Sequence, residues 1–204
     1  MNNIGQSYYR LGDVQQSLSW YERALSIDPN HIASLYNKGR SLIDVERYEE
    51  ALACFDQLTN HHRRSEDPEI LLEKGLTLVE LSRNEEALIC LDKCLQLDAE
   101  NAYAYLNKAR ALIGLSRFKE ALDNAEMALA KDPNKAIFWA VKGRTLYHLG
   151  LYSKAKSTLD KAVEFEKVPA CAWLYRALTF EKLGDNEQAM SSFWNYLQTP
   201  KCPV

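Results

Sequence analysis

A small residue returns at a nearly constant interval along the whole chain, and this repetition constrains the fold more than any other feature. The small residues are Gly5, Gly39, Gly75, Ala109, Gly143 and Ala177. Their separations are 34 (39−5), 36 (75−39) and then 34 three times (109−75, 143−109, 177−143). A second small residue follows twelve positions (17−5) after each of them, at Ser17, Ala51, Ala87, Ala121, Ala155 and Ala189. A repeat near this length indicates stacked helical pairs rather than a globular enzyme around one core.

Residues 102–135 show how one repeat is built. Apolar side chains share one helical stripe from Tyr105 to Leu115, and a second stripe begins at Phe118. Asp132 and Pro133 end the second stripe, because proline cannot continue a helix. The pattern therefore predicts a helix, a tight turn and an antiparallel helix.

The small residues have a physical role in this arrangement. They stand where two helix axes must approach closely, and a larger side chain would push the helices apart. A different set of glycines falls in the turns, where a helix end favours a left-handed residue: Gly12, Gly150 and Gly184.

Repeat after repeat shows the same alternation of bulky and small residues, closed in two repeats by Pro29 and Pro133. One repeat reads Trp139, Gly143, Leu146, Ala155, Leu159 and Ala162. Over nearly its whole length the chain resembles the tetratricopeptide repeat (TPR) family. The resemblance implies an all-α fold, a right-handed α-α superhelix (solenoid) of six helix-turn-helix TPR repeats. We number them repeat 1 (1–30, short at its N-terminus), repeat 2 (32–65), repeat 3 (68–101), repeat 4 (102–135), repeat 5 (136–169) and repeat 6 (170–199), with a tail at 200–204.

Composition narrows the possible partners. The formal net charge is −3, with 47% hydrophobic and 26% charged residues. A general phosphate-binding surface needs a strong basic excess, so we expect no nucleic acid partner. No run of apolar residues is long enough to span a membrane, and no signal peptide is visible. Five cysteines, an odd number, favour buried thiols in a reducing cytoplasm, with Cys202 in the tail the most exposed.

The chain shows no sign of catalysis, of a cofactor or of a metal. A nucleophile with a base and an orienting acid is not apparent, nor is a glycine-rich phosphate loop. His148 is the only histidine expected within a helix. The basic cluster His61-His62-Arg63-Arg64 is interpreted as a solvated loop. We therefore expect a protein that is not an enzyme.

In TPR proteins the first helix of each repeat faces the concave side, so the resemblance implies which residues line a groove. The lining has apolar and aromatic area with a few directional polar groups, which suits a peptide or partner segment that is acidic and apolar. The implied groove residues are Tyr36, Asn37, Arg40, Leu72, Leu76, Tyr103, Asn107, Arg110, Val141, Arg144, Tyr147 and Tyr175. The lysine and asparagine pattern of the chaperone-type carboxylate clamp is absent from both possible registers, which disfavours chaperone tails.

Two polar motifs leave alternatives open. Asn37 and Asn107 either hold an extended backbone, as in asparagine ladders of related grooves, or bond locally to neighbouring helices. Arg40 and Arg110 either bind ligand carboxylates or form ion pairs with nearby acidic residues of the chain. Arg144 has fewer acidic neighbours in sequence and is the better candidate for a ligand.

The C-terminal repeat offers a second kind of surface. In the last helix, expected over 187–198, Phe193 and Leu197 match the buried stripe. Trp194 falls where earlier repeats carry an acid, at Asp56, Asp92, Glu126 and Asp160. An exposed tryptophan there predicts a homodimer through the C-terminal repeat, at Phe193 and Trp194, or a tail folded back from 200–204. The alternatives to a groove-binding scaffold are therefore a structural self-assembly module or the regulatory portion of a larger protein.

Overall fold

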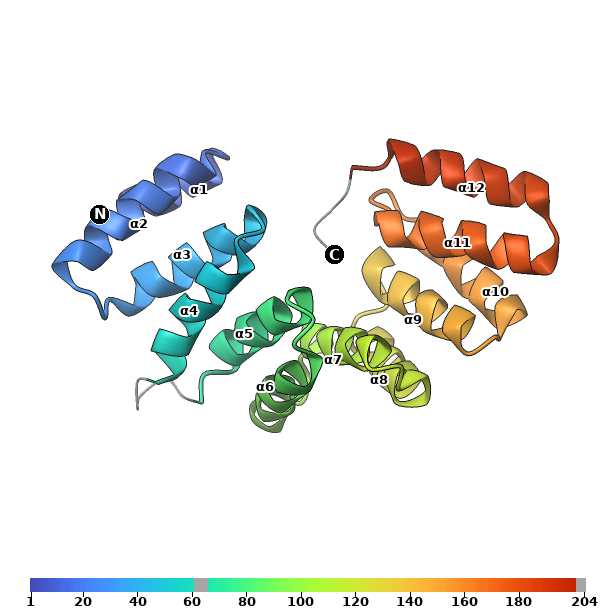
Figure 1. Cartoon of the computed structure of the whole chain (residues 1–204), viewed down its shortest axis with the longest axis horizontal. Helices are drawn as coiled ribbons and strands as arrows, with labels where there is room; N and C mark the ends of the chain where they lie inside the picture. Colours follow the sequence, from blue (N-terminus) through green and yellow to red (C-terminus); the bar gives the residue numbers. More distant parts are fainter. Residues whose placement is uncertain (61–65, 201–204) are drawn as a thin grey trace. The chain divides into compact units, whose positions relative to one another are not determined.

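The structure is a computed structural model that describes residues 1–60 and 66–200. Within these residues the chain forms twelve α-helices and no strand, which confirms the all-α helical repeat (Figure 1). The helices are α1 (Asn2–Arg10), α2 (Val14–Ile27), α3 (Ile32–Asp44), α4 (Tyr48–Thr59), α5 (Pro68–Glu80), α6 (Asn84–Leu97), α7 (Ala102–Gly114), α8 (Phe118–Lys131), α9 (Ala136–His148), α10 (Tyr152–Ala162), α11 (Ala170–Leu183) and α12 (Asn186–Gln198).

Each of the six repeat ranges contains two consecutive helices, α1 and α2 in repeat 1 through α11 and α12 in repeat 6. The helices gather into two compact units. The N-terminal unit, Met1–Ala99, contains α1 to α6, and the C-terminal unit, Glu100–Val204, contains α7 to α12. Within each unit, the two helices of a repeat contact one another and the helices of the neighbouring repeat.

The close approach predicted at the small residues is present in the structure. A Cβ atom on Gly39 of α3 would lie 2.7 Å from Cζ of Phe55 on α4. A Cβ atom on Gly143 of α9 would lie 2.4 Å from Cγ of Leu159 on α10. Phe55 and Leu159 are fully buried, so the space above each glycine is filled by a core side chain of the paired helix.

The turns confirm the expectation for glycine. Gly12, Gly150 and Gly184 have φ angles of 81°, 73° and 80°. Three other repeats place Glu46, Ser82 and Ser116 in the same left-handed region, with φ angles of 60°, 58° and 59°. The turn geometry is therefore common to the repeats, and glycine is the residue that adopts it with least strain.

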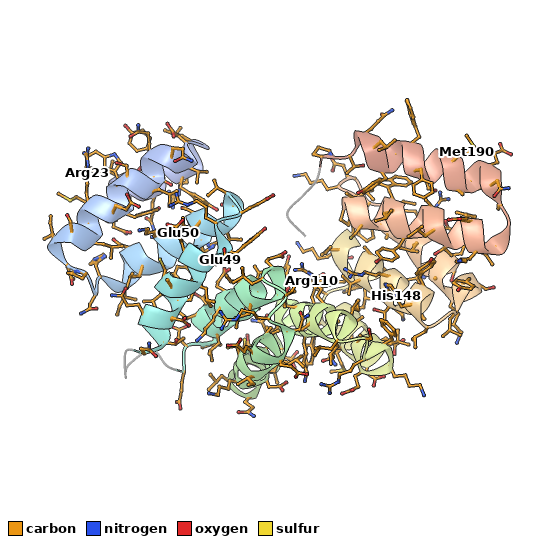
Figure 2. The ribbon with its side chains drawn as sticks, in the orientation of Figure 1. Arg23, Glu49, Glu50, Arg110, His148 and Met190 are labelled. Atoms are coloured by element: carbon orange, nitrogen blue, oxygen red, sulfur yellow. The ribbon has the colours of Figure 1, made fainter. Side chains whose placement is uncertain are left out.

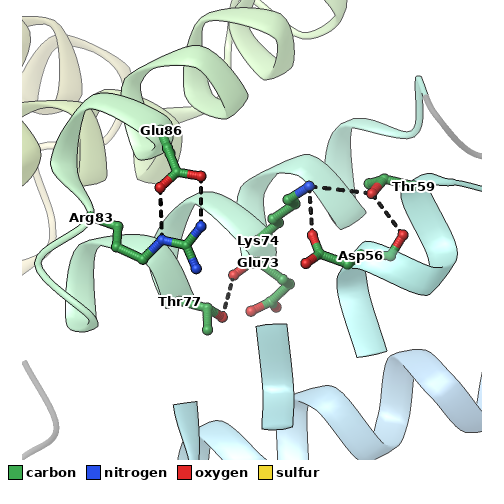
Figure 3. A network of polar contacts seen from close by, with 7 residues as sticks. All are labelled: Asp56, Thr59, Glu73, Lys74, Thr77, Arg83 and Glu86. Atoms are coloured by element: carbon green, nitrogen blue, oxygen red, sulfur yellow. Dashed lines mark hydrogen bonds and ion pairs between the residues drawn. The ribbon is translucent and has the colours of Figure 1, made fainter. Parts of the chain in front are cut away.

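Ion pairs join successive repeats in a regular series, which we call the inter-repeat ladder. Each pair links an acid on the second helix of one repeat to a base on the first helix of the next. The pairs are Lys38–Glu22 (3.2 Å), Lys74–Asp56 (2.7 Å), Lys142–Glu126 (3.0 Å) and Arg176–Asp160 (2.8 Å). Figure 3 shows the second of these, in which Lys74 Nζ also donates to Thr59 Oγ1. Such pairs add little stability each, but they mark the register in which one repeat meets the next.

One expectation about the C-terminal repeat was wrong. Leu197 was expected on the buried stripe of the last helix, yet it is 74% exposed. Its register position is that of Leu25, which packs on the core shared by repeats 1 and 2. The first helix of a following repeat supplies this cover, and α12 has no following repeat among the described residues.

The expectations about the cysteines, the basic cluster and membrane spans concern residues that the structure describes only in part. Cys54, Cys90 and Cys94 are buried free thiols and Cys171 is partly buried. Burial raises the pKa of each of the four thiols. The basic cluster at 61–64 and Cys202 in the tail at 201–204 lie outside the described residues. Within the described part, none of the helices combines the length and the apolar character that crossing a membrane requires.

Candidate functional site

All twelve groove residues implied by the resemblance lie on first helices of the repeats, and they divide between the two units. In the N-terminal unit α3 carries Tyr36, Asn37 and Arg40, and α5 carries Leu72 and Leu76. In the C-terminal unit α7 carries Tyr103, Asn107 and Arg110, α9 carries Val141, Arg144 and Tyr147, and α11 carries Tyr175. The two sets are described separately below.

In the N-terminal set, Arg40 is paired within the protein. Its Nε lies 3.4 Å from Oε1 of Glu73 on α5, and its guanidinium lies 5.9 Å from the centroid of the Tyr36 ring. Asn37 is also engaged locally, because its Nδ2 donates to Oδ1 of Asn2 on α1 at 3.1 Å. A small hollow at these residues is lined by Gln6, Tyr9, Arg10, Tyr21, Asn37, Arg40 and Ser41. The local interpretation of Asn37 and Arg40 therefore matches their observed partners.

Two tyrosines in this region, Tyr9 of the hollow and Tyr36 of the set, hold their protons unusually tightly. Burial, and then the hydrogen bond that Tyr9 Oη donates to Asp44 Oδ2 at 2.6 Å, raise the pKa of Tyr9 to about 12. Burial, and then the nearby Glu73 carboxylate, raise the pKa of Tyr36 to about 12 against the opposing effect of Arg40.

These pKa values predict a loss of stability at alkaline pH. In the folded state both phenols keep their protons at pH values above 10.0, which is the pKa of tyrosine in the unfolded chain. The stabilisation is complete below pH 10 and is lost as the pH rises toward 12, because the unfolded chain releases the protons first. Urea titrations at a series of pH values should show this fall, and Tyr9→Phe should reduce its slope. An unchanged slope in Tyr9→Phe would contradict the assignment.

In the C-terminal set, the residues of α7 are largely buried. Asn107 and Arg110 are 4% and 9% exposed, and Asn107 Oδ1 accepts a hydrogen bond from Arg110 Nη1 at 3.2 Å. Val141 on α9 is 2% exposed. Tyr103 is about half exposed and packs edge-to-face on Phe138, with ring centroids 5.3 Å apart. The accessible part of this set therefore consists of Tyr103 and of the partly buried Arg144, Tyr147 and Tyr175.

Arg144 differs from the other groove arginines. Its Nε is a buried side-chain nitrogen with no hydrogen-bond partner, and it is the one such atom found among the described residues. Its guanidinium lies 5.4 Å from the centroid of the Tyr175 ring on α11. A cation stacks favourably on an aromatic face, but the ring does not replace the missing hydrogen-bond acceptor.

Tyr175 belongs to a connected cluster of aromatic rings from four helices, which we call the aromatic cluster. Tyr147 contacts His148, Tyr152 and Tyr175, each at a centroid distance of 5.6 Å. His148, labelled in Figure 2, stacks on Phe118 at 5.0 Å. His148 Nε2 also lies 3.3 Å from Tyr175 Oη. The cluster therefore places a connected set of aromatic rings beside Arg144, with Tyr175 in direct contact.

The electrostatics of the cluster favour an anion. Burial, and then the positive charge of Arg144, lower the pKa of His148 below its ordinary value of 6.5. The imidazole is therefore neutral at pH 7. The chemistry offered is that of one cation among rings, which can hold a carboxylate flanked by apolar side chains.

Sequence reasoning found Arg144, Tyr147 and Tyr175 but missed three other members of the cluster. Phe118 and Tyr152 begin α8 and α10, the second helices of repeats 4 and 5. His148 is the last residue of α9. An aromatic residue at the first position of two successive second helices was the available signal.

The residues expected at a self-association surface lie on α12. Phe193 is partly buried, and Trp194 is 64% exposed. They belong to the end of the C-terminal unit and not to the aromatic cluster.

Comparison with known proteins identifies the repeats. Two tetratricopeptide repeat family models match the chain, one over residues 1–64 and the other over 36–102 and 106–170. No curated protein sequence matches it. A tetratricopeptide repeat protein from Parabacteroides merdae ATCC 43184 has a similar structure, with a TM-score of 0.82, 21% identity, and coverage of 97% of this chain and 77% of its own.

Two further solved structures share the fold. PilW, a widely conserved type IV pilus biogenesis factor, has a TM-score of 0.81 and 21% identity, and the match covers 95% of this chain and 89% of PilW. YrrB, a TPR protein with an unusual peptide-binding site, has a TM-score of 0.64 and 23% identity, and the match covers 84% of this chain and 87% of YrrB. With the helix pairs, the repeat register and the family matches in agreement, the chain belongs to the tetratricopeptide repeat family, whose members act as protein-interaction scaffolds.

Proposed function

We propose that this protein is a non-catalytic scaffold that binds a peptide or partner segment on the first-helix face of its C-terminal unit, and that the bound segment is acidic and apolar. The observation that carries the proposal is Arg144, a partly buried cation whose Nε is buried and has no hydrogen-bond partner. Leaving a buried charged donor unsatisfied is costly, so a ligand that brings an acceptor gains affinity. A carboxylate supplies that acceptor together with the opposite charge.

The aromatic cluster accounts for the apolar part of the ligand. Tyr147 and Tyr175 are partly buried and present ring area beside the guanidinium. Rings bury much area at little entropic penalty, which suits them to hold leucine or phenylalanine side chains next to the acid. The peptide-binding site of YrrB supports peptide recognition on this fold.

The N-terminal unit contributes less charge selectivity under this proposal. Arg40 already has Glu73 as its partner, so an incoming carboxylate would compete with an existing ion pair. Tyr36, Leu72 and Leu76, all partly buried, offer apolar contact instead. We assign the protein to the cytoplasm, which the free thiols of Cys54, Cys90, Cys94 and Cys171 support.

Fluorescence anisotropy with short labelled peptides tests the proposal. The probes are peptides in which leucine and phenylalanine alternate with aspartate or glutamate, beside sequences in which lysine replaces each acid. The wild type should prefer the acidic series. Arg144→Gln should weaken that binding about tenfold or more, because a desolvated charge pair loses one partner. Arg144→Glu combined with Tyr147→Ala should abolish it.

Lys154→Gln is the matched control, since it removes one positive charge from the exposed face of α10. It should change the affinity by less than about twofold, as expected for an exposed charge. Equal binding of acidic and basic peptides, or equal losses in Arg144→Gln and Lys154→Gln, would reject the proposed site. Affinity capture from the native lysate with wild type and the double variant would then identify the partner.

A further inference from the structure

The inter-repeat ladder ends at both ends of the repeat series in an apolar residue. The bases of the ladder share the register of Ile4, since 38−4 is 34, and the acids share the register of Trp194, since 194−160 is 34. Ile4 on α1 and Trp194 on α12 are 42% and 64% exposed. A terminal repeat that only met solvent would keep a polar outer face. In this chain Ile4 and Trp194 are apolar at the positions where the ladder residues are charged.

On α12 the exposed tryptophan is part of a larger apolar face. Met190 (labelled in Figure 2) and Leu197 are each 74% exposed and lie on the same side of α12 as Trp194, at the i, i+4 and i+7 positions. We call these three residues the α12 end face. Scattered exposed apolar residues are ordinary, but three on one helical face are not.

The register shows what kind of surface covers such a face. Met190 and Leu197 occupy the positions of Leu18 and Leu25 in repeat 1. Leu18 is buried in the core cluster that contains Leu35 of α3, and Leu25 packs against the same cluster. The natural cover for a second helix is therefore the first helix of a following repeat.

A matching first-helix surface is present at the other end of the chain. We call Ile4 and Ser7 on α1, with Leu11 directly after it, the α1 end face. They share the register of Lys38 and Ser41 on α3 and of Val45 directly after it. In the interior, Ser41 is buried and its Oγ lies 3.5 Å from Ser17 Oγ of the preceding repeat, while Val45 packs on the shared core. On α1 the same positions are uncovered, and Leu11 is 80% exposed.

We infer that the α1 end face of a second copy of this chain docks on the α12 end face, so that repeat 1 of one copy follows repeat 6 of another. The contact continues the interface that already joins neighbouring repeats. Ile4 of one copy meets Trp194 of the other where the interior has an ion pair. The interface is heterologous, since two different surfaces meet, and the joined pair keeps one free end of each kind.

This arrangement differs from a two-fold dimer of α12 faces. Inside the repeats, the bulky face of a second helix meets a first helix that carries a small residue between its flanking side chains, such as Ser41. Two α12 end faces would oppose Trp194 and Met190 of one copy with the same bulky residues of the other. The α1 end face, with Ser7 between Ile4 and Leu11, has the complementary shape.

Charge substitutions at the two ends test the inference by sedimentation velocity across the micromolar range. Wild type should associate, and Ile4→Lys and Trp194→Glu should each weaken association about thirtyfold or more, since each removes an interface anchor. A mixture of the two variants should regain association. Trp194 of the first variant still meets Ile4 of the second, and the lysine and glutamate introduced at the other two ends can pair as the ladder residues do.

Other outcomes overturn the inference and have separate meanings. A monomeric wild type would show that the end faces stay free. Undiminished association of Ile4→Lys, with no complex in the mixture, would show a two-fold contact of α12. Ile27→Lys and Ile89→Glu, at exposed positions elsewhere on α2 and α6, are the matched controls and should associate like wild type. Peptide binding by Arg144 should be retained in every variant, so this inference and the proposed function can fail separately.

Discussion

Replacing Gly143 by leucine is expected to lower the free energy of unfolding of the C-terminal unit by about 3 kcal/mol or more. A Cβ atom alone would lie 2.4 Å from Cγ and 2.6 Å from Cδ2 of Leu159, closer than real carbon atoms approach. Leu159 is fully buried, in a cluster with Leu146 and Ala155, so its side chain has no free space into which it can move. The helices α9 and α10 must therefore separate, and the core beneath them opens.

Urea unfolding followed by hydrogen–deuterium exchange, which reads the two units separately, measures this loss. Gly114→Leu at the exposed last position of α7 is the matched control. It should be neutral or slightly stabilising, since leucine is a better helix former than glycine by roughly 0.5–1 kcal/mol.

Repeat 4 suggests a further check, because Ala109 and Ala125 hold the positions of Gly143 and Leu159 there.

The double variant Gly143→Ala with Leu159→Ala should therefore be more stable than the sum of its single variants predicts. Each single change leaves either a clash or a cavity, whereas the pair reproduces the combination that repeat 4 uses. Strict additivity of the two single effects would contradict the packing account of the small residues.

Phe55→Ala is the second substitution with a large expected effect, a loss of about 3–5 kcal/mol from the N-terminal unit. Phe55 is fully buried, covers the bare backbone of Gly39, and packs edge-to-face on Tyr36 at 6.3 Å. Removing the ring leaves a cavity that Gly39 has no side chain to fill. The helices α3 and α4 lose the contacts of Phe55 with Gly39 and Tyr36.

The loss should appear as faster amide exchange in α3 and α4 and an earlier urea transition of the N-terminal unit. Ile27→Ala is the control, because Ile27 is an apolar residue of the same unit that is 71% exposed. It should change stability by less than about 0.5 kcal/mol. Similar effects of Phe55→Ala and Ile27→Ala would show that the ring does not support the repeat.

The two proposals are linked if both hold. Copies joined end to end would each carry one aromatic cluster with Arg144, so a partner with several acidic segments would bind with higher effective affinity than one segment alone. Comparing a single peptide with a tandem peptide, in wild type and in Trp194→Glu, would separate intrinsic affinity from this effect.

The groove residues show how far sequence reasoning reaches. The repeat register assigned Arg40, Arg110 and Arg144 to first helices, and the structure agrees. The register could not show that Arg40 pairs with Glu73 of the next repeat, or that Arg144 Nε is left without an acceptor. Such partners lie on helices of different repeats, and the side-chain rotamers that bring them together depend on packing.

The end of the chain gives the same lesson for burial. The stripe pattern placed Leu197 in the core, because periodicity describes which face of a helix points inward. Whether that face is covered depends on a neighbouring element, and at α12 the described residues supply none, so Leu197 and Met190 are exposed.

By itself the sequence determined the helix pairs, their boundaries near Pro133 and Gly184, and the close contact at Gly39 and Gly143. These features depend on local propensity, on steric size and on a repeated register, all of which are readable in one dimension. Only the tertiary structure decided which cation lacks a partner and which apolar face lacks a cover. Those properties depend on distances between side chains of different helices, and a repeat interval does not specify such distances.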